Sequence, residues 1–169
     1  AVLDHFRNPR NVGVADEYNG KSIAGDPECG DFLEVTIRVD ETTLRVSEVK
    51  FRCRGCPAAI ATSSMMTVLV QSKNLNEVLD LTEADIVAAL GGLPRGKEHC
   101  SMLGIQAIRD AVADYLLYSM MRHKGMIEDR FQFESIMNGK KVTLGIHVCD
   151  GTCQGLSSNT DTGSAGEQM

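Results

Sequence analysis

The sequence contains no tryptophan, and only 5% of its 169 residues are aromatic, so it offers few side chains on which nucleic-acid bases could stack. Basic residues are also in the minority, because 17 Lys and Arg stand against 23 Asp and Glu, a formal net charge of −6. Such an acidic chain is poorly suited to binding a phosphate backbone or an anionic membrane surface. We therefore expect neither a nucleic acid nor a membrane as partner.

Long apolar runs are missing as well. No uninterrupted hydrophobic stretch approaches the ~20 residues that cross a bilayer, although 43% of the residues are hydrophobic, close to the globular average. A chain of 169 residues can bury one hydrophobic core but not two. The sequence therefore predicts one soluble folded domain.

Strand patterns come before helix patterns along the chain. Residues 32–39 and 44–53 alternate between apolar and polar, with a turn at 40–43, and a short strand at 22–24 is expected at the edge of the same sheet. Helical patterns cover a short segment before Asn8 and residues 57–72, 84–90 and 101–122. This order predicts an α+β fold with a small antiparallel three-stranded sheet, helices packed on one face and a long C-terminal helix.

We divide the chain into a domain at residues 1–124, an extension of unassigned role at 125–156 and a tail at 157–169. The tail is rich in Ser, Thr and Gly, which predicts disorder. The extension has a weak strand pattern at 142–148 and carries His147, Cys149 and Cys153. Three such residues do not close a metal site, so these two thiols are interpreted as incidental.

Cysteine is the residue type that most needs explaining. Six are present: Cys29, Cys53, Cys56, Cys100, Cys149 and Cys153. A core of this size needs no disulfides, and no apolar signal segment precedes Leu3. We expect a reducing compartment, which is the cytoplasm, or the mitochondrial matrix if a targeting peptide has been removed. There, grouped cysteines more often bind metal or carry sulfur chemistry than form disulfides.

Three of the cysteines fall at the ends of predicted elements. Cys29 precedes a strand, and Cys56 and Cys100 each precede a helix, where the dipole and unpaired N–H groups favour the thiolate. Asp31 and His99 lie beside them and each could supply a fourth ligand. From these residues alone, the set fits a structural zinc site as well as an iron–sulfur cluster. A catalytic thiol and unligated buried cysteines stay open.

Several longer motifs add a resemblance to a known family. They are HFRNPRNVG at 5–13, ECGD at 28–31, GC with AAIATSS at 55–64, LP with a basic tail at 93–97, and HCSML at 99–103. Together they resemble the U-type iron–sulfur cluster assembly scaffolds, IscU and the N-terminal domain of NifU, over residues 1 to about 122. The resemblance implies a scaffold, not an enzyme, that builds a transient 2Fe–2S cluster and passes it to apo-proteins.

The resemblance also implies roles for individual residues. Cys29, Cys56 and Cys100 would be the thiolate ligands of iron, with Asp31 a labile or release-promoting ligand and His99 a further ligand. Cys100 would accept persulfide sulfur from a cysteine desulfurase. The other partners implied are a ferredoxin as electron donor, a frataxin-like protein, Hsp70 and J-protein chaperones, apo iron–sulfur acceptor proteins and a second copy in a homodimer. Zinc is the metal implied for the apo form.

The chain departs from the family pattern in three places, one of which is Pro57, which follows the second ligand cysteine where the family usually has Gly or Ala. The family's chaperone-binding segment reads Leu-Pro-Pro-Val-Lys, whereas this chain has Leu93-Pro94-Arg95-Gly96-Lys97, which leaves recruitment of the chaperone open. Cys53 stands where the family commonly has Thr. We interpret Cys53 as a packed strand residue, and a role as fourth ligand is the alternative.

The same residues leave two alternative functions open. One is a zinc-dependent SufU-like sulfurtransferase, whose members carry a long insertion between the second and third ligand cysteines and usually lack the preceding His. The short spacing from Cys56 to Cys100 and the presence of His99 favour the scaffold. The other is a metal-stabilised interaction module without cluster chemistry, which would lose its fold on chelation.

Overall fold

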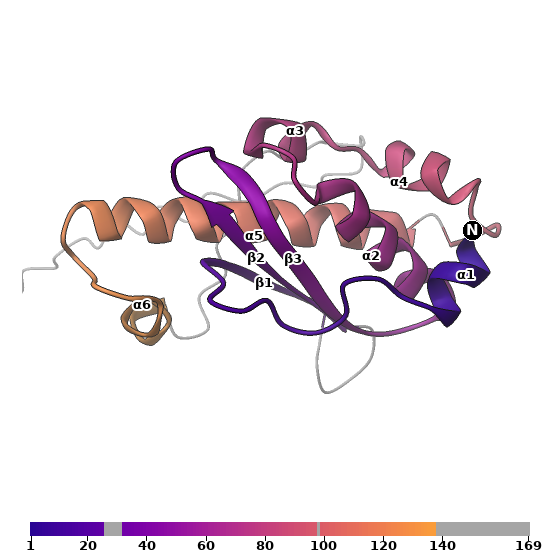
Figure 1. The fold of residues 1–169 in the computed structure, drawn as a ribbon. Helices are drawn as coiled ribbons and strands as arrows, with labels where there is room; N and C mark the ends of the chain where they lie inside the picture. Colours follow the sequence, from indigo (N-terminus) through magenta and orange to yellow (C-terminus); the bar gives the residue numbers. More distant parts are fainter. Residues whose placement is uncertain (26–31, 98, 138–169) are drawn as a thin grey trace, which may run out of the picture.

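The structure is a computed structural model, and it describes residues 1–25, 32–97 and 99–137. An antiparallel sheet in the order β1–β2–β3 lies at its centre (Figure 1). The strands are β1 (Gly20–Gly25), β2 (Phe32–Asp40) and β3 (Arg45–Arg54). The three predicted strands are confirmed, with β1 at the edge. At the predicted turn, Asp40 Oδ1 accepts hydrogen bonds from the backbone N–H groups of Thr42 and Thr43.

The described residues form six helices. They are α1 (Val2–Arg7), α2 (Pro57–Val70), α3 (Leu75–Asp80), α4 (Glu83–Leu90), α5 (His99–His123) and α6 (Arg130–Met137). The predicted helices before Asn8 and at 57–72, 84–90 and 101–122 are confirmed, whereas the sequence pattern predicts neither α3 nor α6. None of the described helices is long and apolar enough to span a membrane.

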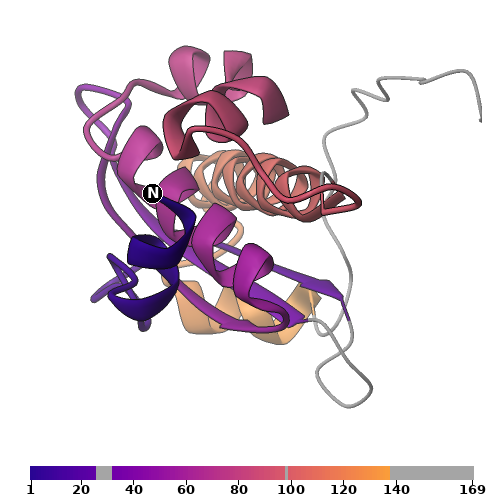
Figure 2. The ribbon, with the colours of Figure 1, turned by 90° about the vertical axis from the view of Figure 1, so that its right-hand side faces the viewer.

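One face of the sheet carries the core. Leu33, Val35 and Ile37 of β2 are fully buried. Helix α5 packs along β1 and β2, and α2 packs on β3, so that these helices form a layer over this face (Figures 1 and 2). Gly20 permits a close approach of β1 to α5, because a Cβ at this position would lie 2.6 Å from the carbonyl oxygen of Ala111 in α5. The predicted α+β architecture is confirmed.

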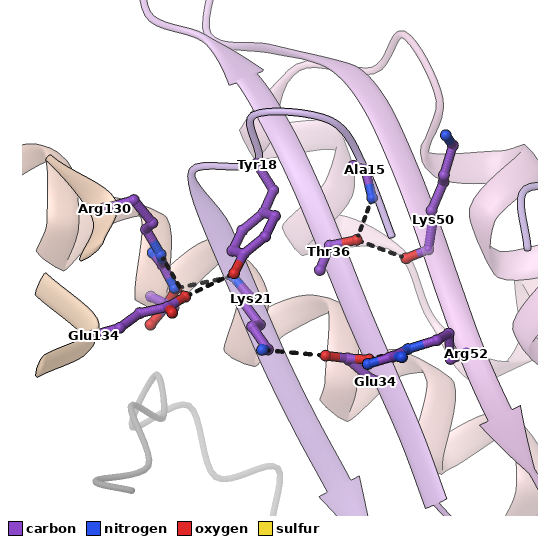
Figure 3. Close-up of polar contacts among 10 residues, drawn as sticks. Ala15, Tyr18, Lys21, Glu34, Thr36, Lys50, Arg52, Arg130 and Glu134 are labelled. Atoms are coloured by element: carbon purple, nitrogen blue, oxygen red, sulfur yellow. Dashed lines mark hydrogen bonds and ion pairs between the residues drawn. The ribbon is translucent and has the colours of Figure 1, made fainter. Parts of the chain in front are cut away.

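The opposite face of the sheet is polar and carries a buried carboxylate. Glu34 of β2 has a side chain only 4% exposed, and it pairs with Lys21 of β1 and Arg52 of β3 (Figure 3). On the same face, Thr36 Oγ1 accepts a hydrogen bond from the N–H of Ala15, which ties the segment before β1 to the sheet. The ion pairs of Glu34 therefore join all three strands.

Replacing Glu34 with glutamine should lower the free energy of unfolding by about 1–3 kcal/mol, because the change removes a buried charge that holds two cations. Glu48→Gln is the matched control, since among the described residues Glu48 pairs only with Lys50, and its side chain is 28% exposed. Its expected cost is below about 0.5 kcal/mol. Chemical denaturation measures both values, and equal losses would contradict the structural role assigned to Glu34.

Helix α6 is anchored to the domain by its first residue, Arg130. The Arg130 guanidinium pairs with Asp114 of α5, with 2.5 Å between Nη2 and Oδ2, and lies 4.8 Å from the ring centre of Phe133. Glu134 accepts hydrogen bonds from Arg130 and from the Tyr18 hydroxyl (Figure 3). Figure 2 shows α6 apart from the layer formed by α2 to α5. The first part of the predicted extension thus packs on the domain.

Candidate functional site

Two of the predicted ligand cysteines lie side by side. Cys56 is the residue that caps the start of α2, and Cys100 lies in the first turn of α5. Their Sγ atoms are 3.8 Å apart. Cys100 is 3% exposed, whereas Cys56 is half-buried. Two thiols separated by 43 residues of chain therefore meet where two helices begin.

Local sequence explains why both helices begin at this point. Pro57 takes the first helical position of α2, where its missing N–H costs nothing. Before α5, the N–H of Cys100 donates to the carbonyl of Lys97 in a turn. Thr62 of α2 then donates its hydroxyl to the Cys100 carbonyl at 3.2 Å. This hydrogen bond fixes the start of α5 against α2.

The surroundings of Cys56 favour its thiolate. Burial alone would raise the pKa of the Cys56 thiol. Hydrogen bonds from the backbone N–H groups of Ala59 and Ala58, the contact with the Cys100 thiol and the charge of Lys97 outweigh burial, so the pKa lies below its usual value. A thiolate at this position is available to bind a metal ion or to attack sulfur.

A third cysteine packs at the same place. Cys53 lies on β3 opposite Leu33, on the face of the sheet that carries the core. Its side chain is half-buried and contacts both the main core and a small cluster made of Ala58, Ala59 and Cys100. The interpretation of Cys53 as a packed strand residue is confirmed. Its position also puts it among the site's thiols.

Among the remaining predicted site residues, the structure describes only His99. His99 is exposed at the first position of α5. Cys29 and Asp31 lie outside the described residues, as do His147, Cys149, Cys153, the strand pattern at 142–148 and the tail. Within the described ranges, no three His, Cys, Asp or Glu side chains are close enough together to hold a metal ion. The full ligand set therefore stays a prediction.

Chain connectivity is compatible with that prediction. Phe32, which directly follows Asp31, pairs with Arg54 in the β2–β3 ladder. The chain thus enters β2 at the end of the sheet where β3 leads to Cys56. Sequence reasoning missed two supporting residues, Thr62 and Lys97. The sequence pattern gives Lys97 no role beside the cysteines, and nothing in the pattern around Thr62 indicates that its hydroxyl reaches α5.

A polar hollow of about 1010 Å³ lies at the other end of the sheet. Its lining includes Arg38 and Arg122, which pair with Glu17 and Glu41 respectively. The charged residues that line it are of both signs, so the hollow does not present a field of one sign to an ionic ligand. We therefore regard the cysteine end of the molecule as the candidate site.

Comparison with known proteins gives matches to one group of proteins. A family model described as the NifU-like N terminal domain matches residues 1–122. The "Iron-sulfur cluster assembly scaffold protein IscU" of Aquifex aeolicus is 47% identical over 116 residues, which cover 69% of this chain and 74% of that protein. The "Iron sulfur cluster assembly protein 1, mitochondrial" of Debaryomyces hansenii is 39% identical over 138 residues, 80% of this chain and 76% of that protein.

Solved structures share the fold. The N-terminal part of a NifU-like protein from Brucella abortus superposes with a TM-score of 0.53 at 16% sequence identity, covering 69% of this chain and 92% of that one. A scaffold protein ascribed to the SUF system of Fervidobacterium Islandicum gives a TM-score of 0.51 at 17% identity, covering 66% and 93%. At these identities the likeness concerns the fold alone.

Proposed function

Because the chain belongs to the NifU-like N-terminal domain family, we propose that it is a scaffold on which a 2Fe–2S cluster is assembled and from which the cluster passes to apo-proteins. The observation that carries this proposal is the pair of thiols at 3.8 Å, Cys56 and Cys100, at the starts of two helices. The cluster is cargo here, so the protein acts as a carrier and not as an enzyme.

The site residues divide the work between holding and releasing the cluster. Cys56 and Cys100, together with Cys29, are the proposed thiolate ligands, and Asp31 or His99 completes the set. Clusters of this kind usually have four thiolates, so a set with one carboxylate or imidazole should bind less firmly. The exposed position of His99 suits a ligand that an acceptor protein can displace. A weakly bound fourth ligand therefore favours transfer of the cluster to an acceptor protein.

Sulfur enters through Cys100 in this proposal. A cysteine desulfurase supplies it as a persulfide, and a ferredoxin supplies the electrons that reduce it to sulfide. Cys100 is 3% exposed, so the groups that cover it have to move before the desulfurase can reach it. A frataxin-like protein, chaperones of the Hsp70 and J-protein type and a homodimer remain partner predictions. We assign this activity to a reducing compartment, the cytoplasm or the mitochondrial matrix.

Metal analysis during sulfur delivery separates this proposal from the zinc-dependent sulfurtransferase. The purified protein is incubated anaerobically with ferrous iron, L-cysteine and the desulfurase of the same organism, and bound zinc and iron are measured over time. We expect iron to enter the site and any zinc to leave it. Zinc that stays stoichiometric, together with faster desulfurase turnover, would replace the scaffold proposal with the sulfurtransferase.

A further inference from the structure

The candidate site contains one thiol more than the proposed ligand set uses. Cys53 comes from the end of β3, Cys56 from the start of α2 and Cys100 from the start of α5. All three are thiols and not disulfides. Cys53 and Cys56 both pack against the cluster of Ala58, Ala59 and Cys100. Three elements therefore bring three cysteines together around one small apolar cluster.

Cys53 differs from the other inward-facing residues of its strand. Val49 and Phe51 are 1% and 2% exposed and belong fully to the core. Cys53, the next inward position, is only half-buried. It lies where the main core meets the cluster of Ala58, Ala59 and Cys100. Packing alone would not require a sulfur atom at this position, because any small apolar side chain could fill it. A sulfur atom at this boundary can both pack and react.

Assembly of a 2Fe–2S cluster would benefit from a second thiol that can hold sulfur. A 2Fe–2S cluster contains two sulfide ions, while Cys100 is proposed both to accept each sulfur and to bind iron. A Cys100 that carries a persulfide cannot accept a second sulfur until the first has moved. A neighbouring thiol outside the ligand set could hold the first sulfur and free Cys100.

We propose that Cys53 is a second sulfur-holding thiol, which takes the outer sulfur of a Cys100 persulfide. The Cys53 thiolate attacks that outer sulfur, so a new S–S bond forms at Cys53 while the S–S bond at Cys100 breaks. Cys100 leaves as a thiolate with the bonding electron pair, and the Cys53 proton goes to solvent. The transferred sulfur keeps its oxidation level, so the step needs neither oxidant nor reductant.

The surroundings of Cys53 suit a thiol that holds sulfur for a time. Cys53 and Cys56 pack against the cluster of Ala58, Ala59 and Cys100. Ala58 and Ala59, which are 5% and 2% exposed, place their apolar methyl groups beside these thiols. A persulfide formed here is therefore shielded on that side from reaction with solvent thiols. This inference rests on the proposed function of Cys100.

The test uses the full chain without iron. The wild-type protein, Cys53→Thr, Cys53→Ser and Cys100→Ser are incubated anaerobically with L-cysteine and the desulfurase of the same organism, and the added sulfur is counted and assigned to individual cysteines by peptide mass spectrometry. We expect wild type to carry sulfur on Cys53 and Cys100, and both Cys53 variants to carry it on Cys100 alone. The sulfur bound at the site should halve. In Cys100→Ser, Cys53 should stay unmodified.

Each other outcome overturns a defined part of the account. Sulfur on Cys100 alone in wild type would refute the role of Cys53 and leave the proposed function intact. Sulfur on Cys53 in Cys100→Ser would show that the desulfurase loads Cys53 directly, which contradicts transfer from Cys100. If neither cysteine of wild type is modified, sulfur acceptance by Cys100 is wrong, and the inference fails with it.

Discussion

Cys100→Ser should lower the yield of assembled cluster in a desulfurase-driven reaction by at least about a hundredfold, since the variant lacks both the sulfur-accepting nucleophile and one iron ligand. Serine is close in size to cysteine, so the buried first turn of α5 should keep its packing. The hydrogen bond from Thr62 goes to the backbone carbonyl of residue 100 and is unaffected by the change. Absorption of the reconstituted protein in the visible range measures the yield.

Cys153→Ser serves as the matched control, because Cys153 lies outside the proposed ligand set. We expect this variant to assemble cluster as wild type does. Far-ultraviolet circular dichroism of both variants checks that the helices persist. A Cys100→Ser protein that is folded and assembles cluster normally would remove Cys100 from the site.

Arg130→Ala should cost about 3 kcal/mol of unfolding free energy near neutral pH and release α6 from the domain. The loss arises because the Asp114 side chain, which is only 12% exposed, would keep a buried negative charge without its cation. The stacking of Arg130 on the Phe133 ring is lost as well. Chemical denaturation measures the loss, and hydrogen exchange of residues 130–137 reports on α6.

The pH dependence of Arg130→Ala tests this cause. Burial raises the pKa of Asp114 in the wild-type protein, against the opposing effect of Arg130. Without Arg130 the pKa should rise further above its unfolded value. Stability gained by protonating Asp114 is then present at low pH and lost as pH rises through the folded-state pKa. We therefore expect the cost of Arg130→Ala to shrink as the pH is lowered from about 7 to about 4.

A double variant isolates the interaction. Adding Asp114→Asn to Arg130→Ala should recover part of the lost stability near neutral pH, because the uncompensated charge is gone. In the wild-type background, Asp114→Asn should instead lower the stability, since it breaks the ion pair with Arg130. A cost of Arg130→Ala that is the same in both backgrounds would show that Asp114 is not responsible.

The regular elements could be predicted where local signals and periodicity agree. Alternation predicts β2 and β3, and α4 is bounded by the Thr82 and Asp85 capping box and by Gly91 in the left-handed conformation. Helix α3 has a capping box of the same kind, Asn74 with Glu77, but only six residues follow the cap. Such a short stretch shows too little periodicity to predict a helix.

Helix α6 could not be predicted for a different reason. It has eight residues, and its single buried side chain is Phe133. The contacts that hold it come from Asp114 and Tyr18, which lie far away in the sequence. Tertiary packing, and not helix propensity, therefore decides that this segment is helical.

The candidate site was predictable in outline only. Placing Cys56 and Cys100 at helix starts follows from the sequence, and their being brought together depends on how α2 packs against α5. The contact of Cys53 with the cluster of Ala58, Ala59 and Cys100 depends on the register of β3, in which Cys53 pairs with Leu33 of β2. Periodicity gives the face of Cys53 but not its distance from another element.

The most direct test of the scaffold proposal is anaerobic assembly followed by transfer. The protein is incubated with ferrous iron, L-cysteine and the desulfurase, iron and acid-labile sulfide are measured beside the visible spectrum, and an apo-ferredoxin is then added. The proposal predicts near-equal iron and sulfide, sulfur-to-iron absorption bands, and loss of those bands from the scaffold as the ferredoxin gains its cluster. Absence of labile sulfide, or a cluster that never leaves, would contradict it.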